Sequence, residues 1–161
     1  MPPVLEQPVS HDYSTDESAI RGIVAACESA WNAGDAAAFT SAMADDIDFI
    51  NVLGERRQGR ETVERGHRHI FATIYKDSRV RYTLDEIRFV RPDVTLAFIH
   101  AHLISRLPPN AIAATAREAQ IADEMHESQA RPTMILAKSN GHWRIVAFQN
   151  TSVAPALTAR A

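Results

Sequence analysis

The first part of the chain carries apolar residues at helical spacing. They recur from Ile20 to Trp31, which predicts an amphipathic helix whose apolar stripe faces a core. Ser14 and Glu17 stand at the spacing of a capping box, so Ser14 is expected to be the N-cap of this helix. Gly34 follows the last apolar position and is expected to end the helix.

Two further helices and one strand are predicted in the next segment. Asp35 is a suitable N-cap for a short helix through Phe39 and Met43. Residues 46–53, with the sequence DIDFINVL, alternate like a strand up to Gly54. A third helix is expected after Gly59, because the apolar residues that follow fall on one helical face. These residues are Val63, His67, Ile70, Phe71 and Ile74.

The second part of the chain alternates with period two and predicts two β-hairpins. Residues 79–90 and 94–107 are the strands of the first hairpin, joined by the sequence Arg-Pro-Asp. Residues 132–148 supply the second hairpin, with an Asn-Gly pair at its tip. In the first of these strands the apolar phase slips by one residue at Asp85, which predicts a β-bulge or a bend.

Three segments show no clear pattern. Residues 1–13 and 154–161 are expected to be tails, which leaves a single domain over residues 14–153. The stretch from Pro108 to Gln129 lies between the hairpins. It is rich in alanine, but its apolar stripe is thin, so we predict a partly helical loop.

The order of these elements predicts an α+β domain, with three N-terminal helices packed on one face of a mostly antiparallel sheet. The sheet strands are apolar on both faces, although helices can cover only one of them. A second copy of the chain is therefore expected to cover the other face, in a homodimer built through the sheet.

Composition narrows the classes of partner. The 17 basic and 20 acidic residues give a net charge of -3 and are spread along the chain, which argues against nucleic acid and membrane surfaces as partners. The first residues carry no signal-peptide pattern. Cys27 is the single cysteine and has no partner for an intrachain disulfide, so a cytoplasmic location is expected.

Several motifs resemble one family. They are the Trp-Asn-x-Gly-Asp turn from Trp31 to Asp35, the Gly-Arg pair that opens the third helix, His67, and the closing segment from Trp143 to Thr151. Together they resemble the SgcJ/EcaC family of the nuclear transport factor 2-like superfamily, relatives of SnoaL-like polyketide cyclases and ketosteroid isomerases. The likeness covers about residues 16–153. It implies a cone-shaped fold in which a curved sheet wraps around a long helix and leaves a pocket, usually in a dimer. The connection after Pro108 looks longer than is usual in that family.

His67 is the first candidate for chemistry, because it interrupts an apolar helical stripe that must face the sheet. It is either a core histidine bonded to a backbone carbonyl or a pocket residue that exchanges a proton. Trp31 and Phe71 are expected to form walls beside it, and Trp31 serves equally well as a core residue.

Two histidines, His100 and His102, stand two apart on a predicted strand and therefore share one face. This spacing occurs among metal ligands, but no Cys, Asp or Glu is held nearby by spacing, so no metal is expected. Structural, ligand-facing or interfacial roles are open to both.

Three amide side chains stand at predicted strand ends. Asn51 shares a face with Ile47 and Phe49. Gln149 follows the phase of Trp143, and Asn150 takes the opposite face, so only one of the two points toward the helices. The amides either orient a ligand at a pocket or satisfy backbone groups at the end of the sheet.

The leading hypothesis is a small-molecule pocket that carries out proton transfer without a cofactor on an apolar carbonyl or hydroxy compound. His67 is the candidate general acid or base for isomerisation, cyclisation or dehydration, and Asn51 and Gln149 would orient oxygens. The related isomerases and cyclases use an inward carboxylate, whereas periodicity places none inside this chain. The alternative is a noncatalytic module that binds a ligand or associates with itself.

Overall fold

A computed structural model describes residues 12–108 and 123–154 of the chain. Three helices occupy the N-terminal half: α1 (Ser14–Ala33), α2 (Ala36–Thr40) and α3 (Arg60–Ala72). The strands are β1 (Met43–Ile50), β2 (Arg56–Gln58), β3 (Arg79–Arg91), β4 (Val94–Ser105), β5 (His126–Ala130), β6 (Thr133–Ser139) and β7 (His142–Gln149). None of the helices in these described ranges is both long enough and apolar enough to cross a membrane.

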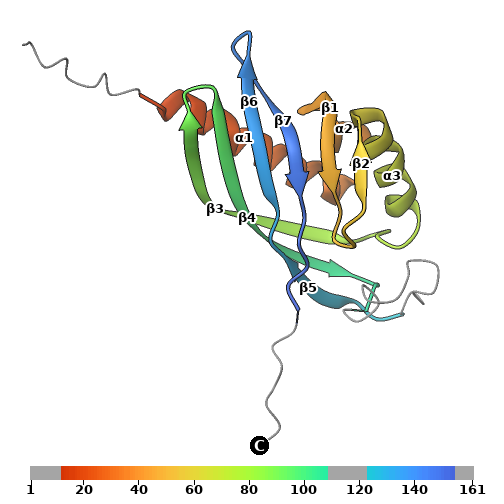
Figure 1. Cartoon of the computed structure of the whole chain (residues 1–161). Helices are drawn as coiled ribbons and strands as arrows, with labels where there is room; N and C mark the ends of the chain where they lie inside the picture. Colours follow the sequence, from red (N-terminus) through yellow and green to blue (C-terminus); the bar gives the residue numbers. More distant parts are fainter. Residues whose placement is uncertain (1–11, 109–122, 155–161) are drawn as a thin grey trace, which may run out of the picture.

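The strands form one seven-stranded sheet in the order β2-β1-β7-β6-β4-β3, with β5 paired to β4. All neighbours are antiparallel except β1 and β7, which are parallel. Helix α1 crosses one face of the sheet, and α3 lies beside β1 and β2 (Figure 1). The predicted α+β class, with N-terminal helices on a curved and mostly antiparallel sheet, is confirmed.

The sheet is curved because β3 and β4 turn sharply midway along their length (Figure 1). The predicted bulge at Asp85 is confirmed, since the register of β3 on β4 shifts between Leu84 and Glu86. At the turn β4 changes partner: Val94–Phe98 pair with β6, and Ala101–Ser105 pair with β5. The long strand pair thereby bends across the end of the other strands.

Local signals around α1 are partly confirmed. Gly34 ends the helix in the left-handed region at φ 66°, where glycine is favoured. The Asp35 side chain accepts the Ala38 N–H at 2.9 Å and caps α2, as expected. The helix is shorter than predicted, because it ends at Thr40 and Met43 already belongs to β1. The predicted capping box is wrong. Tyr13 is the N-cap and makes no side-chain cap bond, while Ser14 already lies inside the helix.

Hydrophobic residues of α1 pack onto the sheet as the helical spacing predicts. Ile20, Val24, Cys27 and Ala30 are buried in one hydrophobic cluster with Phe39 of α2 and with inner-face residues of β1, β4, β6 and β7. Cys27 directs its Sγ toward the Phe39 carbonyl, and burial raises its pKa to about 12. It is therefore a packing residue and not a nucleophile at neutral pH.

The predicted face assignment along β7 is wrong beyond Ile145. The register shifts so that Ile135 pairs with Ala147 while Leu136 pairs with Ile145, which leaves Val146 as an extra residue. This bulge keeps Ile145 and Phe148 on the core face and turns Ala147 outward. The extra residue also reverses the predicted face of each residue that follows in the chain.

The end of β1 and the segment before β6 also differ from expectation. The strand stops at Ile50, and Asn51 begins a turn instead of continuing the strand to Gly54. His126–Ala130 form the strand β5, where a partly helical loop was predicted. The pairing of β5 satisfies the backbone groups of Ala101–Ser105, for which β6 is too short. Residues 109–122 of that predicted loop lie outside the described residues.

Side chains of α1 cover the free edge of β3. The Asn32 amide donates to the Val80 carbonyl at 2.9 Å and accepts the Val80 N–H at 2.7 Å. One helical turn earlier, the Glu28 carboxylate accepts the Tyr82 N–H at 2.6 Å. The helix thus takes the place of a neighbouring strand along this part of the edge.

A buried carboxylate fixes the start of α1 to the hairpin of β6 and β7. Asp16 is 6% exposed, and its Oδ1 accepts hydrogen bonds from Trp143 Nε1 at 2.8 Å and Lys138 Nζ at 2.7 Å. The Lys138 side chain is only partly exposed, so the charge of Asp16 is compensated in a largely dry environment.

Candidate functional site

His67 lies on the face of α3 that points into the core, one turn after Val63 and one turn before Phe71. Only 6% of the residue is exposed. Its ring stacks on Phe39 with centroids 4.4 Å apart and meets Phe49 edge-on at 5.2 Å. We use the name aromatic cluster for the set of rings connected in this way: Trp31, Phe39, Phe49, His67, Phe71, Tyr75 and Phe148.

The hydrogen bonding of His67 defines its tautomer. Nδ1 lies 2.9 Å from the Val63 carbonyl oxygen, which can only accept, so Nδ1 carries the proton of the neutral ring. Nε2 then presents a lone pair and has no hydrogen-bond partner in the described part of the chain. Nε2 is not fully enclosed, so it keeps some contact with solvent.

Burial also sets the charge of His67. Desolvation lowers its pKa from 6.5 to about 4, and the bond to the Val63 carbonyl opposes that change only in part. At neutral pH the imidazole is uncharged, so Nε2 can accept a proton or a hydrogen bond but has no proton to give. Of the two roles expected for His67, base fits the neutral ring and general acid does not.

Two predicted wall residues contact His67 in the structure. Trp31 and Phe71 meet its ring edge-on, at 6.2 and 5.8 Å between centroids. The Trp31 indole N–H is engaged, since Nε1 donates to the hydroxyl of buried Ser78 at 3.0 Å. Trp31 therefore contacts the cluster through the face and edge of its ring, while its indole N–H is used in a hydrogen bond within the protein.

Sequence analysis missed Tyr75, which contacts Trp31 at 5.4 Å between ring centroids. Tyr75 stands eight residues after His67, a helical spacing, although α3 ends at Ala72. Burial raises the pKa of its phenol, and within the described residues the hydroxyl has no hydrogen-bond partner. The spacing was the available signal. It was obscured because the chain leaves the helix before reaching Tyr75.

Asn51 is placed in the turn after β1. Its Oδ1 accepts the backbone N–H groups of Leu53 and Glu55, at 2.9 and 3.0 Å. Its Nδ2 donates to the Glu55 carboxylate at 3.0 Å. Those bonds engage both ends of the Asn51 amide. The hydrogen bonds that the Glu55 carboxylate accepts from Arg57 and Asn51 lower its pKa. The structure does not bring Asn51 to His67 through any ring contact or hydrogen bond.

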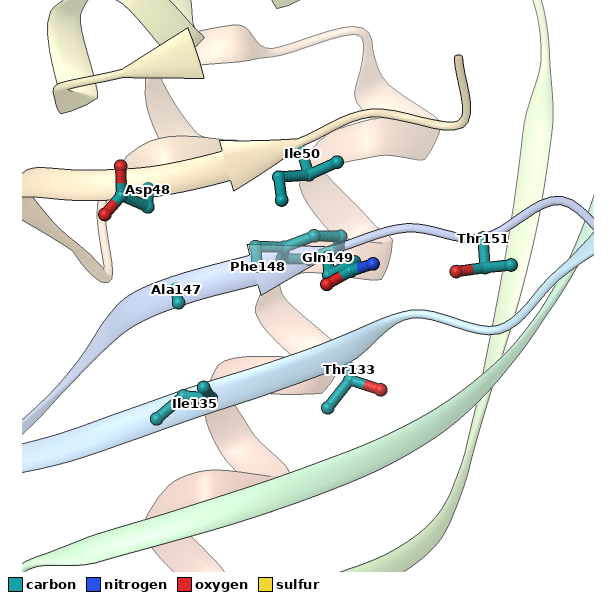
Figure 2. A pocket seen from close by; sticks show the side chains of 8 residues that line it. All are labelled: Asp48, Ile50, Thr133, Ile135, Ala147, Phe148, Gln149 and Thr151. Carbon is teal, nitrogen blue, oxygen red and sulfur yellow. The ribbon is translucent and has the colours of Figure 1, made fainter. Parts of the chain in front are cut away.

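Gln149 and His67 lie on opposite faces of the sheet, a consequence of the bulge at Val146. Gln149 faces away from α1 and lines an open depression of about 360 Å³ on the outer face of the sheet (Figure 2). The depression is lined by Asp48, Ile50, Thr133, Ile135, Ala147, Phe148, Gln149 and Thr151. The Asp48 carboxylate is paired with Arg56 at 2.6 Å. The expected approach of Gln149 to His67 does not occur.

Asn150 follows Gln149 with the opposite alternation. Its backbone N–H donates to the Ile50 carbonyl at 2.9 Å, which fixes it beside the end of β1. Its side-chain Oδ1 is enclosed and lacks a hydrogen-bond partner in the described part of the protein. An enclosed carbonyl oxygen without a donor costs about 1 to 3 kcal/mol, so the position is costly unless something outside the chain fills it.

His100 and His102 share the outer face of β4, as the alternation predicts, and each contacts a side chain of β5. His100 Nε2 lies 2.9 Å from Gln129 Oε1, and His102 Nε2 lies 3.3 Å from Glu127 Oε2. In the described ranges no group of three or more His, Cys, Asp or Glu side chains is placed to hold a metal ion. Neither histidine lines the depression around Gln149.

Within the part of the chain that the structure describes, no free buried carboxylate accompanies His67. Asp16 is the one carboxylate that is buried among the described residues, and it stands at the opposite end of α1 from Trp31. Its oxygen is already shared by Lys138 and Trp143. The cluster therefore offers a neutral base in apolar surroundings without an acidic partner.

Comparison with solved structures shows the fold. A domain with a cystatin-like fold from Nostoc punctiforme is 23% identical, with a TM-score of 0.73 over 89% of this chain and 80% of that one. A hexachlorocyclohexane dehydrochlorinase, LinA type 2, is 13% identical, with a TM-score of 0.72 over 87% of this chain and 86% of that one. A ketosteroid isomerase-like protein from Erwinia carotovora is 15% identical, with a TM-score of 0.67 over 88% of this chain and 99% of that one.

A search of the curated proteins found no match. A family of SnoaL-like domains, in contrast, matches residues 20–155, which run from Ile20 within α1 past the end of β7. The matched range contains the whole aromatic cluster and both strand-end amides of β7. The chain belongs to the family of SnoaL-like domains.

Proposed function

We propose that the chain binds a small, mainly apolar carbonyl or hydroxy compound against the aromatic cluster, and that His67 accepts a proton from it in a cofactor-free isomerisation, cyclisation or dehydration. The observation that carries the proposal is the free lone pair of His67 Nε2, held by the Nδ1 bond to Val63 and surrounded by rings. Similar folds named for a dehydrochlorinase and a ketosteroid isomerase-like protein support it.

The chemistry follows from the neutral imidazole. A base must be unprotonated to act, and the pKa of about 4 keeps His67 in that state at neutral pH. Proton transfer to Nε2 creates a cation inside the cluster, where the faces of Phe39 and its neighbours stabilise positive charge. Turnover is expected to be flat near pH 7 and to fall as the pH drops toward 4, where the base becomes protonated.

A noncatalytic ligand-binding module is the second candidate. The absence of a carboxylate beside His67 within the described residues favours it, because related sites rely on such a charge to hold the proton. The two candidates predict the same ligand but differ in turnover. A bound compound that is recovered unchanged after prolonged incubation would favour the binding module.

Two substitutions of His67 distinguish the roles of its two ring nitrogens. Asn places a donor where Nδ1 stands and keeps the bond to Val63, whereas Gln places an amide where Nε2 stands. If Nε2 serves a ligand, His67→Asn should lose binding and turnover while retaining the fold, and His67→Gln should retain some binding but no proton transfer. A screen of small carbonyl and hydroxy compounds by calorimetry, with product analysis, measures both. Unchanged binding in His67→Asn would contradict the proposal.

Three wider expectations are also proposals. The chain is a homodimer through the outer face of the sheet, where half-buried apolar side chains such as Leu96, Phe98 and Ile135 are uncovered. The motifs from Trp31 to Asp35 and at His67 support membership of the SgcJ/EcaC family. The single buried Cys27 supports a cytoplasmic location.

A further inference from the structure

The depression on the outer face of the sheet has the size of a site for a small molecule (Figure 2). It covers about 360 Å³, at the lower end of the ~300–1,000 Å³ that small-molecule sites usually span. Two rows of side chains cross β6, β7 and β1 to form it, because each strand points alternate residues to this face. The rows are Thr133, Gln149 and Ile50, and then Ile135, Ala147 and Asp48.

The depression is hollow because a small side chain stands in the middle of the second row. Ala147 carries a single methyl group there, between longer side chains of the two neighbouring strands. The bulge at Val146 is the cause, since it turns Ala147 outward and keeps the large Phe148 ring on the core face. The same bulge places Gln149 in the depression. One extra residue in β7 therefore creates both the hollow and its amide.

The polar groups of the depression are uncharged or already paired. The side chains of Thr133, Gln149 and Thr151 make no hydrogen bond within the described part of the chain. They gather toward one end of the depression, and Asp48 lies toward the other (Figure 2). The Asp48 carboxylate accepts a hydrogen bond from Arg56 Nε at 2.8 Å, which compensates its charge. A ligand would meet one free amide and two free hydroxyls, but no unpaired charge among the lining residues.

We infer that this depression binds a neutral compound with several hydroxyl groups, such as a sugar ring or a cyclitol. The Gln149 amide and the two threonine hydroxyls can each donate and accept, and ligand hydroxyls, which also do both, satisfy them in either direction. Ile50, Ile135 and Ala147 form an apolar floor that suits the C–H face of such a ring. A charged ligand would lose hydration without gaining an unpaired opposite charge. The inference is independent of the function proposed for His67.

The alternative occupant of the depression is a second copy of the chain. Two of the apolar side chains proposed for the dimer, Leu96 and Phe98, lie on β4, and β6 separates that strand from β7. Ile135 is the one side chain of that set that also lines the depression. An apolar partner surface placed over the amide and hydroxyls would leave them without hydrogen bonds, which is costly. These polar groups favour a hydroxylated small molecule over a protein surface.

Titration of the full chain at pH 7, followed by NMR, tests the ligand class. The probes are glucose, galactose, mannose and myo-inositol, with cyclohexanol as the single-hydroxyl analogue and glucuronate and glucosamine as charged analogues. One or more of the neutral polyols should bind with a Kd of roughly 1 mM or tighter, and about tenfold more tightly than cyclohexanol. Binding of no polyol overturns the inference. Equal affinity for cyclohexanol, or tighter binding of either charged analogue, overturns the ligand class.

Substitutions locate the site. Ala147→Leu fills the hollow and should weaken polyol binding at least tenfold, whereas Ala137→Leu, the same change on the same face outside the depression, should leave it unchanged. Gln149→Leu should weaken binding several-fold and retain the fold, because the amide has no partner among the described residues. His67→Asn should bind the polyol like wild type, since His67 lies on the other face of the sheet.

Three outcomes would place the polyol elsewhere or remove it. Unchanged binding in both Ala147→Leu and Gln149→Leu overturns the site. A loss of binding in His67→Asn, with the fold intact by circular dichroism, overturns its independence from the site around His67. If no polyol binds and Ala147→Leu changes the sedimentation of the chain while Ala137→Leu does not, the depression belongs to an interface between two copies.

Discussion

Protonation of His67 should make the free energy of unfolding depend on pH. Burial lowers the pKa of His67 from 6.5 to about 4 in the folded chain, whereas the unfolded chain returns it to about 6.5. Between these two values the unfolded chain binds a proton that the folded chain does not. The free energy of unfolding therefore rises with pH across this window. At about 1.4 kcal/mol for each pH unit, His67 contributes about 3 kcal/mol to this rise.

The contribution is fully present above pH 6.5, is lost progressively as the pH falls toward 4, and stays lost below that. Urea denaturation of wild type and His67→Asn at several pH values isolates it, because the other titrating groups are common to both proteins. The difference in unfolding free energy should shrink by about 3 kcal/mol between pH 7 and pH 4. The same substitution at His69, an exposed residue of the same helix, controls for the change of residue type.

Parallel stability curves for wild type and His67→Asn would refute this reasoning. They would mean that the imidazole is as well solvated in the folded chain as in the unfolded one. His67 would then lie in an open, water-filled site and not among packed rings. A titration of the histidine ring protons by NMR gives an independent answer, since the His67 signals should not move until the pH falls well below 6.

Other predictions concern the ends and the outer face of the fold. Asp16→Ala should lower the free energy of unfolding by about 2 kcal/mol, because it leaves the Trp143 N–H buried without an acceptor; thermal denaturation measures the loss, and an unchanged midpoint would contradict it. Sedimentation at micromolar concentration should show a homodimer, which Phe98→Glu should convert to monomers. A wild-type monomer of 17.8 kDa would argue against the sheet interface. Metal analysis of untagged protein should find no stoichiometric metal, since His100 and His102 each contact a β5 side chain. One zinc per chain would contradict that expectation.

The parts of the fold that the sequence predicts correctly depend on local signals. Gly34 ends α1 because glycine readily adopts positive φ, and Asp35 caps α2 through its own side chain. The turn between β6 and β7 uses Asn140 and Gly141, both at positive φ as a tight hairpin turn requires. The bulge at Asp85 was visible because polar residues interrupt the alternation there.

The parts that could not be predicted depend on pairing between distant segments. Ile145 to Phe148 are four apolar residues in a row, so no change of phase marks the bulge at Val146. That single extra residue decides the faces of Gln149 and Asn150. The strand β5 has the polar sequence HESQA and forms because β4 offers it a free edge.

The candidate site shows the same division. Helical spacing indicated that Trp31, His67 and Phe71 point inward, and the structure brings their rings together. Spacing could not indicate that Phe39 and Phe49 complete the cluster, because they come from a short helix and a separate strand. Nor could it indicate that Asn51 would be engaged by the turn that it starts.

The covering of the β3 edge by Asn32 and Glu28 has a consequence for how the chain reaches its fold. Until α1 docks, this edge exposes unpaired backbone groups that a second unfolded chain can extend into an intermolecular sheet. Docking of α1 and aggregation therefore compete for the same hydrogen bonds during refolding. The helix that carries Trp31 to the cluster therefore also protects the edge of β3 from pairing with another chain.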